Sequence, residues 1–394
     1  MSTSFFEFYC PVKVVAGFKA LEHLPFELRT LGVRRPLLVT DRGVREAGLC
    51  APVEEALESA GLPAPPIFDA VPPDSSTRVV AEAARVYRER GCDGLLAVGG
   101  GSVIDTSKAV NVLVSEGGDD IRAYSGTSVL TKRLRPLFVL PTTSGTGSEV
   151  TNVLVLVDAD AGVKLPFVSQ FLLPDVAVLD PRMTLRLPPQ LTAATAMDAM
   201  THAIEAFICL SKNPLSDAYA TAAIRRIADH LLPVLRTPSD AQGRLELSLA
   251  ATMAGIAFSN SMVGLVHALG HSVGAVARVP HGVCMNVLLP FALEFNLPAR
   301  REAIGELLLP LGGPDVYART PAERRAETTI ARLRALRDEL HAHTGLPRTL
   351  GETRQVRRDQ LPEIARLSVD DGALLMNPLD VDVDQALTLL ERAF

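Results

Sequence analysis

Short apolar runs alternate with helical patterns over the first half of the chain. Apolar and polar residues do not alternate in four of these runs. The runs are Leu37–Thr40, Leu95–Val98, Leu137–Leu140 and Val176–Leu179. Such continuous runs are typical of strands that are buried on both faces. Helical periodicity in the intervening sequence predicts helices at about 20–31, 54–59, 76–90 and 103–114. Strands that alternate with helices predict βαβ units and a mostly parallel sheet.

Weaker strand patterns complete this picture. Ile67–Phe68 and Val153–Val157 are expected to add two further strands. The aromatic and β-branched residues between Phe5 and Val15 also predict short strands near the N-terminus.

The pattern changes after Pro189, where long helical periods replace the apolar runs. We therefore place a domain boundary between residues 181 and 190. Residues 1–185 are predicted to form an α/β domain and residues 186–394 an all-helical domain. The arginine-rich segment 321–343 carries an apolar stripe with interleaved acidic residues, as expected for a solvated helix with surface ion pairs.

Composition narrows the class of protein. With 47% hydrophobic residues, 21% charged residues and a net charge of −6, the chain fits a globular protein and shows no basic footprint for nucleic acid or membrane surfaces. The five cysteines are scattered and form no C-x-x-C pair, which favours a reducing compartment. No signal peptide or membrane span is apparent, so a cytoplasmic location is expected.

Five ionisable residues in the second half point to a metal site. Asp198 and His202 lie four residues apart, as do His267 and His271, and His281 follows. A spacing of four places two side chains on one face of a helix. Three imidazoles and a carboxylate suit a divalent transition metal such as iron or zinc. Each pair alone could be an ordinary helix pair or core histidine, but three of the eight histidines fall within 267–281, which favours the metal site.

Two glycine-rich loops predict a phosphate-binding site. Gly99-Gly-Gly-Ser102 follows one predicted strand and opens a helix, and Pro141-Thr-Thr-Ser-Gly-Thr-Gly-Ser-Glu149 follows another. Glycine permits close backbone approach, and the N–H groups of a helix N-terminus favour an anion. Ser102 and Asp105 could also form a capping box. Ligands bind at the carboxyl ends of strands in open α/β sheets, so both loops are expected to line one site.

Asp41 ends an earlier strand and has two interpretations. Its carboxylate could accept hydrogen bonds from ribose hydroxyls and repel a 2′-phosphate, which would favour NAD over NADP. It could equally be a strand-end cap. The usual G-x-G-x-x-G fingerprint is absent.

Four ordered motifs resemble the iron-containing (group III) alcohol dehydrogenases. They are Gly99 to Lys108, Pro141 to Thr151, Asp198 to Glu205, and Gly264 to Gly282, and the Asp371-Gly…Asn377-Pro378 ending also fits. The resemblance implies a Rossmann-like dinucleotide-binding domain, a helical metal-binding domain with a cleft between them, and a homodimer or larger oligomer. This is the architecture of dehydroquinate synthase-like proteins.

The resemblance also implies roles for individual residues. The metal ligands would be Asp198, His202, His267 and His281, with His271 beside the metal and near the substrate. Positions lining the dinucleotide would be Asp41, Gly99, Gly100, Gly101, Ser102, Thr142, Thr143, Ser148, Lys164 and Leu179. Asp105 is added to this set, as is Asp74, which stands where close relatives often carry Asn near the adenosine ribose.

The expected activity is reversible hydride transfer between NAD and a small primary alcohol, diol or aldehyde, with Fe²⁺ as the expected metal and Zn²⁺ as the alternative. His267 and His271 are the expected catalytic residues, and His271 is a candidate proton relay. Three other functions stay open: a metal-dependent lyase of the dehydroquinate synthase type, a metal-free maleylacetate reductase, and a non-enzymatic metal or nucleotide binder.

Overall fold

The structure is a computed structural model, and it describes residues 5–158, 160 and 164–394 of the 394-residue chain. The chain divides into two compact units. An α/β unit contains residues 10–187 and 240–252, and a helical unit contains residues 5–9, 188–239 and 253–394. These ranges differ from the predicted domains 1–185 and 186–394 chiefly in two segments. Segment 5–9 belongs to the helical unit, and segment 240–252 belongs to the α/β unit.

A six-stranded, fully parallel sheet forms the centre of the α/β unit. Its strand order is β1-β9-β6-β4-β2-β3. The strands are β1 (Lys13–Ala16), β2 (Pro36–Val39), β3 (Ile67–Phe68), β4 (Gly94–Gly99), β6 (Leu137–Pro141) and β9 (Val176–Leu179). The predicted parallel sheet is therefore confirmed.

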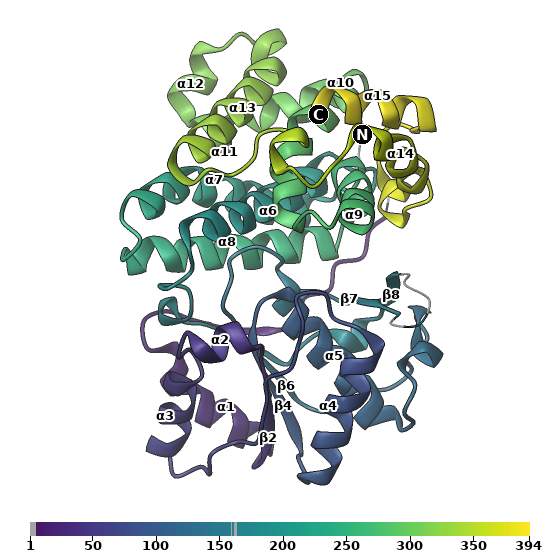
Figure 1. Ribbon diagram of the computed structural model, residues 1–394. Coiled ribbons are helices and arrows are strands. Elements are labelled where there is room, and N and C mark those ends of the chain that lie inside the picture. The colour runs from purple at the N-terminus through teal and green to yellow at the C-terminus, as the bar shows by residue number, and fades with distance from the viewer. Residues whose placement is uncertain (1–4, 159, 161–163) are drawn as a thin grey trace. The chain divides into compact units, whose positions relative to one another are not determined.

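Alternate residues of each central strand pack into two separate cores. In β4, Leu95 and Ala97 join one core and Leu96 and Val98 the other, and all four are fully buried. The first core is covered by α4 (Thr77–Glu89) and α5 (Gly101–Glu116), and the second by α1 (Leu24–Thr30) and α3 (Ala51–Ser59), as Figure 1 shows. Burial on both faces explains why these strands read as continuous apolar runs. The short helix α2 (Arg42–Glu46) follows β2 and was not predicted.

A second, three-stranded sheet contains β5 (Gly126–Thr127), β8 (Lys164–Val168) and β7 (Val153–Val157), in that order. β7 was predicted as a strand, but it pairs antiparallel with β8 and lies outside the main sheet. β8 was not predicted. Its sequence Lys-Leu-Pro-Phe-Val is short and contains Pro166, and proline weakens a strand pattern.

Helices make up the second unit, as predicted. In chain order they are α6 (Pro189–Ile208), α7 (Pro214–Arg236), the last part of α8 (Ala241–Ser259), α9 (Leu265–Ala277), α10 (His281–Glu306), α11 (Leu308–Gly312), α12 (Pro314–Arg319), α13 (Arg325–Thr344), α14 (Leu361–Val369) and α15 (Val383–Ala393). α10 packs against α6, α9 and α13 (Figure 1). By length and composition α10 could cross a membrane, but 67% of its most apolar window is buried inside the structure, which is typical of a core helix.

Close packing of α6 and α10 brings two of the predicted metal ligands together. A Cβ on Gly282 would lie 2.4 Å from the carbonyl oxygen of Ala194, so only glycine permits this approach. Arg300 donates hydrogen bonds to the carbonyl oxygens of Ile208 (2.7 Å) and Cys209 (3.2 Å) and so satisfies the C-terminal end of α6. His281 therefore begins α10 beside the turn of α6 that precedes Asp198.

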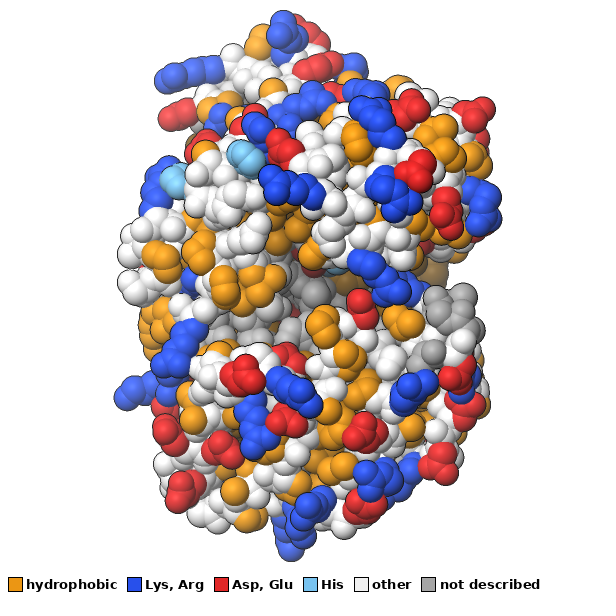
Figure 2. Space-filling model, viewed as in Figure 1, with side chains coloured by type: hydrophobic (Ala, Val, Ile, Leu, Met, Phe, Trp, Pro, Cys, Tyr) orange, Lys and Arg blue, Asp and Glu red, His pale blue; other side chains and the backbone are white. Residues whose placement is uncertain are grey.

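The predicted strands between Phe5 and Tyr9 are absent from the described residues, and this prediction was wrong. The ring of Phe8 instead stacks on Tyr219 of α7, with 5.9 Å between ring centroids. The backbone N–H of Tyr9 donates to the Asn260 side chain at 2.7 Å. The aromatic residues in this segment thus anchor it to the helical unit. On the molecular face in Figure 2, acidic and basic side chains are interspersed over both units.

Candidate metal centre and dinucleotide-binding loops

Helix α6 carries three buried ionisable side chains. Asp198, His202 and Glu205 are spaced four and three residues apart, so they share one face of the helix. Asp198 is 2% exposed, His202 6% and Glu205 2%. The alanine-rich sequence of α6 favours helix and leaves room around these groups.

Helices α9 and α10 supply the remaining imidazoles. α9 begins after Gly264 and ends at Arg278, which adopts the left-handed conformation with φ 59°. This turn leads through Val279 and Pro280 to His281 at the start of α10. One ligand atom each of Asp198, His267 and His281 lies within 4.8 Å of the other two, so the structure brings these three predicted ligands together.

His202 lies beside this group rather than within it. Its Nδ1 is 3.8 Å from Oδ1 of Asp198, whereas Nε2 of His281 is 3.2 Å from the same oxygen. The ring of His202 stacks between His267, at 4.5 Å, and Phe258, at 4.3 Å between centroids. His202 is therefore next to both Asp198 and His267, and its Nδ1 is the nitrogen nearer to Asp198.

The pKa shifts of Asp198, His202 and His267 favour the ionisation states that metal ligands require. Burial alone would raise the pKa of Asp198, but the neighbouring His202 and His281 hold it well below its usual value. Burial lowers the pKa of His202 to about 3 and the pKa of His267 well below its usual value. The carboxylate is thus charged and both imidazoles are neutral, which leaves lone pairs for a cation.

Two buried nitrogen atoms support the fit to a metal. Nδ1 of His202 and Nε2 of His267 have no hydrogen-bond partner among the described residues. A buried polar atom without a partner costs about 1–3 kcal/mol, and a divalent cation bound to both nitrogen atoms would remove that cost. The donor set of one carboxylate and three imidazoles suits Fe²⁺ or Zn²⁺.

His271 lies next to this group and is held by a carboxylate. Its Nδ1 is 3.0 Å from Oδ2 of Asp371, whose other oxygen accepts the backbone N–H of Ala373 at 2.8 Å. The ring is 31% exposed and stacks on His281, with 5.4 Å between centroids. Asp371 therefore fixes the orientation of a partly exposed imidazole.

The two glycine-rich loops are adjacent in the α/β unit, as predicted. Gly99 pairs with Pro141 at the carboxyl ends of β4 and β6, and Thr142 donates its N–H to the carbonyl oxygen of Gly99 at 3.1 Å. A Cβ on Gly101 would lie 2.8 Å from Cγ2 of Thr146, and one on Gly100 would lie 3.3 Å from Oγ1 of Thr143. A side chain at Gly101 would force Thr146 to move, and one at Gly100 would crowd Thr143, so the two glycines favour this close approach of the loops.

Ser102 and Asp105 do not form the capping box that the sequence offered as an alternative. Gly100 is the N-cap of α5, which places Ser102 inside the helix, where its hydroxyl donates to the carbonyl oxygen of Pro73. Asp105 instead accepts the Ser148 hydroxyl at 2.8 Å and the N–H of Val155 at 3.0 Å. Asp105 therefore links α5 to the second loop and to β7.

Lys108 occupies the centre of this link and is fully buried. Its ammonium group lies 2.8 Å from the carbonyl oxygen of Thr151, 2.9 Å from that of Val153 and 3.1 Å from the hydroxyl of Ser148. Burial lowers its pKa to about 8, although Asp105 and Glu149 oppose that shift. Glu149 accepts the Thr252 hydroxyl at 2.7 Å, so the second loop is fixed on two sides.

The other predicted cofactor residues are distributed around these loops. Asp41, after β2, and Leu179, at the end of β9, lie at the same edge of the sheet as Gly99. Asp41 is the N-cap of α2 and accepts the N–H of Val44 at 2.8 Å, as the second interpretation of this residue expected. Asp74 is exposed in the loop before α4, and Lys164 is exposed at the start of β8.

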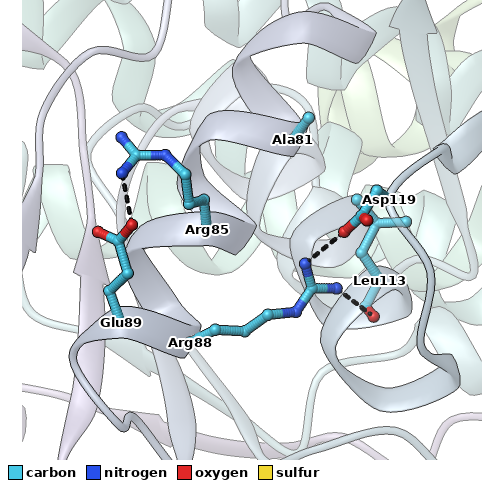
Figure 3. A pocket seen from close by; sticks show the side chains of 6 residues that line it. All are labelled: Ala81, Arg85, Arg88, Glu89, Leu113 and Asp119. Carbon is cyan, nitrogen blue, oxygen red and sulfur yellow. Dashed lines mark hydrogen bonds and ion pairs between the residues drawn. The ribbon is translucent and has the colours of Figure 1, made fainter.

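A surface pocket between α4 and α5 contains none of these residues. It is lined by Ala81, Arg85, Arg88, Glu89, Leu113 and Asp119 (Figure 3). Arg88 bonds to Asp119 at 2.7 Å and Arg85 to Glu89 at 2.6 Å. Each arginine of the pocket therefore has an acidic partner within the pocket itself.

Three residues at these sites were not assigned roles from the sequence: Glu205, Asp371 and Lys108. Glu205 and Lys108 fall inside the quoted motifs, and Asp371 opens the C-terminal motif. Their positions in those motifs were the one sign in the sequence that they have a role. Spacing could not reveal their contacts, because their partners are distant in the sequence.

An α/β unit with glycine loops and a helical unit with a histidine–aspartate cluster define a metal-dependent, nucleotide-dependent class of enzyme. Two family models match the chain: "Iron-containing alcohol dehydrogenase" over residues 11–181, and "Fe-containing alcohol dehydrogenase family, C-terminal" over residues 192–394. The chain belongs to the iron-containing alcohol dehydrogenase family and is an oxidoreductase acting on CH–OH groups.

Individual relatives match over the whole length. The chain is 33% identical to an NAD-dependent methanol dehydrogenase of Bacillus methanolicus, covering 98% of this chain and 99% of that protein. It is 34% identical to a 1,3-propanediol dehydrogenase of Citrobacter freundii, with 100% of both covered. The crystal structure of a 1,3-propanediol oxidoreductase superposes with a TM-score of 0.93 at 34% identity, covering 99% of this chain and 100% of that one.

Proposed function

We propose that this protein is an iron-dependent, NAD-dependent alcohol dehydrogenase that reversibly oxidises a small primary alcohol or diol. The observation that carries the proposal is the convergence of Asp198, His267 and His281 within 4.8 Å, beside the buried, unpaired nitrogen of His202. Bound metal supplies Lewis acidity towards the substrate oxygen, and bound NAD accepts or donates the hydride.

The metal would be held by Asp198, His202, His267 and His281. Iron is the metal in the name of the matching family, and the same ligand types accept zinc. Burial lowers the pKa of His202 and of His267, which favours the neutral imidazoles that a metal ligand requires. The neighbouring residues on α6 and α9 are apolar, and Ala199, Ala203 and Leu269 are fully or almost fully buried.

His271 would transfer the proton that accompanies oxidation of the alcohol. Asp371 at its Nδ1 orients the ring so that Nε2 exchanges the proton of the substrate hydroxyl with solvent. A positioned general base typically contributes about 10²–10⁴-fold to rate. His267 would contribute to catalysis by binding the metal.

The dinucleotide would bind at the carboxyl edge of the parallel sheet. Gly99, Gly100, Gly101 and Ser102 present backbone N–H groups at the start of α5, which suit a pyrophosphate. Thr142, Thr143, Ser148, Leu179, Asp74 and Lys164 would line the remaining surface. Asp105 would act through Ser148 rather than by direct contact, because its two oxygens already accept protein hydrogen bonds.

Asp41→Gly is expected to shift coenzyme preference towards NADP. Removal of the carboxylate removes repulsion of a 2′-phosphate, while glycine is tolerated at an N-cap at a cost of only a few tenths of a kcal/mol. The ratio of kcat/KM for NADP to that for NAD should rise at least tenfold with little change in thermal stability. An unchanged ratio would limit Asp41 to its capping role.

A small primary alcohol or diol is proposed as substrate because the matched relatives are named for methanol and 1,3-propanediol and the metal ligands lie in apolar surroundings. A homodimer or larger homo-oligomer in the cytoplasm is proposed with it. No nucleic acid or membrane partner is proposed.

The direct test is a panel of primary alcohols and diols with NAD and Fe²⁺-reconstituted protein, followed by absorbance of reduced nicotinamide. The proposal expects turnover that is lost on chelation. A lyase of the dehydroquinate synthase type would bind NAD but give no net reduction of it, and a maleylacetate reductase would keep its activity without metal.

A further inference from the structure

Glu205 is the fully buried carboxylate that lies behind the metal-binding group. It belongs to α6, but both of its oxygens face α9. Oε1 accepts the backbone N–H of Val266 at 2.6 Å, and Oε2 lies 2.5 Å from Nδ1 of His267. One carboxylate therefore contacts both the backbone at the start of α9 and the side chain of a proposed ligand.

The N-terminus of α9 requires partners from elsewhere in the chain. Its N-cap is Gly264, which has no side chain to accept the first N–H groups. Asn377 accepts the N–H of Leu265 at 3.2 Å, while Glu205 accepts that of Val266. A Cβ on Gly264 would lie 2.9 Å from Oδ1 of Asn377 and 3.3 Å from Oε1 of Glu205, so glycine permits both side chains to reach the helix end.

The requirement for a carboxylate follows from the number of acceptors. The N–H of Val266 is always a donor. A metal on Nε2 of His267 requires the proton to be on Nδ1, which makes Nδ1 the second donor. The two donors face different oxygens, Val266 at Oε1 and His267 at Oε2, so both atoms at the end of the side chain have to accept. Glutamate offers two acceptor oxygens, whereas glutamine offers one oxygen and an NH₂ donor.

Resting on the proposed function, we infer that Glu205 is a positioning residue that orients His267 for the metal. Its carboxylate keeps the imidazole proton on Nδ1, so that Nε2 is free of a proton and directed at Asp198 and His281. The same carboxylate, which belongs to α6, caps the N-terminus of α9. Asn377 performs only the capping part of this role, at the neighbouring N–H. The Asn377-Pro378 motif at the end of the chain is thereby connected to the metal-binding helix.

Glu205→Gln preserves the size of the side chain but removes one acceptor. If the amide oxygen keeps the Val266 N–H, the amide NH₂ donates to Nδ1 and moves the imidazole proton to Nε2, where it blocks the metal. If the amide turns round, its oxygen accepts from Nδ1 of His267, but its NH₂ group faces the N–H of Val266, which then has no acceptor. Either arrangement weakens metal binding, and partners of ligand histidines typically contribute 10–100-fold in affinity.

The test is Co²⁺ binding, measured by visible absorption, to metal-free wild type, E205Q, N377A and H267A, together with the thermal midpoint of each metal-free protein. We expect E205Q to bind Co²⁺ 10–100-fold more weakly than wild type, in line with that range. N377A should lose at least as much thermal stability as E205Q but keep Co²⁺ affinity within about threefold of wild type. Glu205→Asp, which keeps two oxygens on a shorter stem, should fall between wild type and E205Q.

Co²⁺ affinity of E205Q equal to that of wild type would overturn the inference. So would equal losses of affinity in E205Q and N377A, because a purely structural role predicts them. Failure of the proposed function is distinguishable, because wild type would then bind Co²⁺ no better than H267A.

Discussion

Replacing His267 with alanine is expected to abolish metal binding and, with it, alcohol oxidation. His267 supplies the buried Nε2 that has no partner among the described residues, and it lies on α9 between the carboxylate of Glu205 and the Asp198–His281 pair. Alanine removes that nitrogen and leaves a cavity in which no other described side chain replaces it. Metal content after reconstitution and turnover with NAD are the two measurements.

His271→Ala is the matched comparison on the same helix, one turn further along. His271 pairs with Asp371 and is 31% exposed, so its loss should leave metal content unchanged and lower turnover by about 100-fold, as expected for a general base. Equal loss of metal in the two variants would refute this division of roles.

Lys108→Met is expected to destabilise the α/β unit by about 3–5 kcal/mol, the usual cost of removing one partner of a buried charged group. The ammonium group of Lys108 donates hydrogen bonds to Ser148, Thr151 and Val153. The negative charges of Asp105 and Glu149 stabilise its positive charge. Methionine would fill the volume but leave the carbonyl oxygens of Thr151 and Val153 without their donor. It would also remove the favourable charge interaction of the ammonium group with Asp105 and Glu149. Urea-induced unfolding measures the loss.

Lys132→Met provides the control for charge and side-chain length. The Lys132 ammonium lies 3.1 Å from Glu116, but its side chain is 54% exposed, and exposed pairs contribute at most about 1 kcal/mol. A loss in K108M no larger than that in K132M would contradict a central role for the buried lysine.

The parallel sheet and the ligand spacing were accessible from sequence because both depend on local periodicity. Leu95–Val98 is a continuous apolar run since its alternate residues enter two different cores. Asp198 and His202 share a helix face by spacing alone. The fold class was therefore confirmed, whereas β8 was missed because Pro166 interrupts a short strand.

Contacts between distant segments were not accessible in this way. Glu205 meets Val266 and His267 about sixty residues further on, and Asp371 meets His271 across a hundred. The Ser102–Asp105 spacing fitted a capping box, but Gly100 begins the helix and Asp105 turns to Ser148 instead. Local patterns cannot distinguish a local hydrogen bond from a tertiary one with the same residue.

The central claim is that one divalent ion is bound by Asp198, His202, His267 and His281. Anomalous diffraction at the iron absorption edge, on crystals of the Fe²⁺-reconstituted protein, tests it most directly. The account predicts a single strong peak within bonding distance of Asp198, His267 and His281, with the His202 ring turned to complete the set. A peak elsewhere, or ordered protein at this position with no peak, would contradict it.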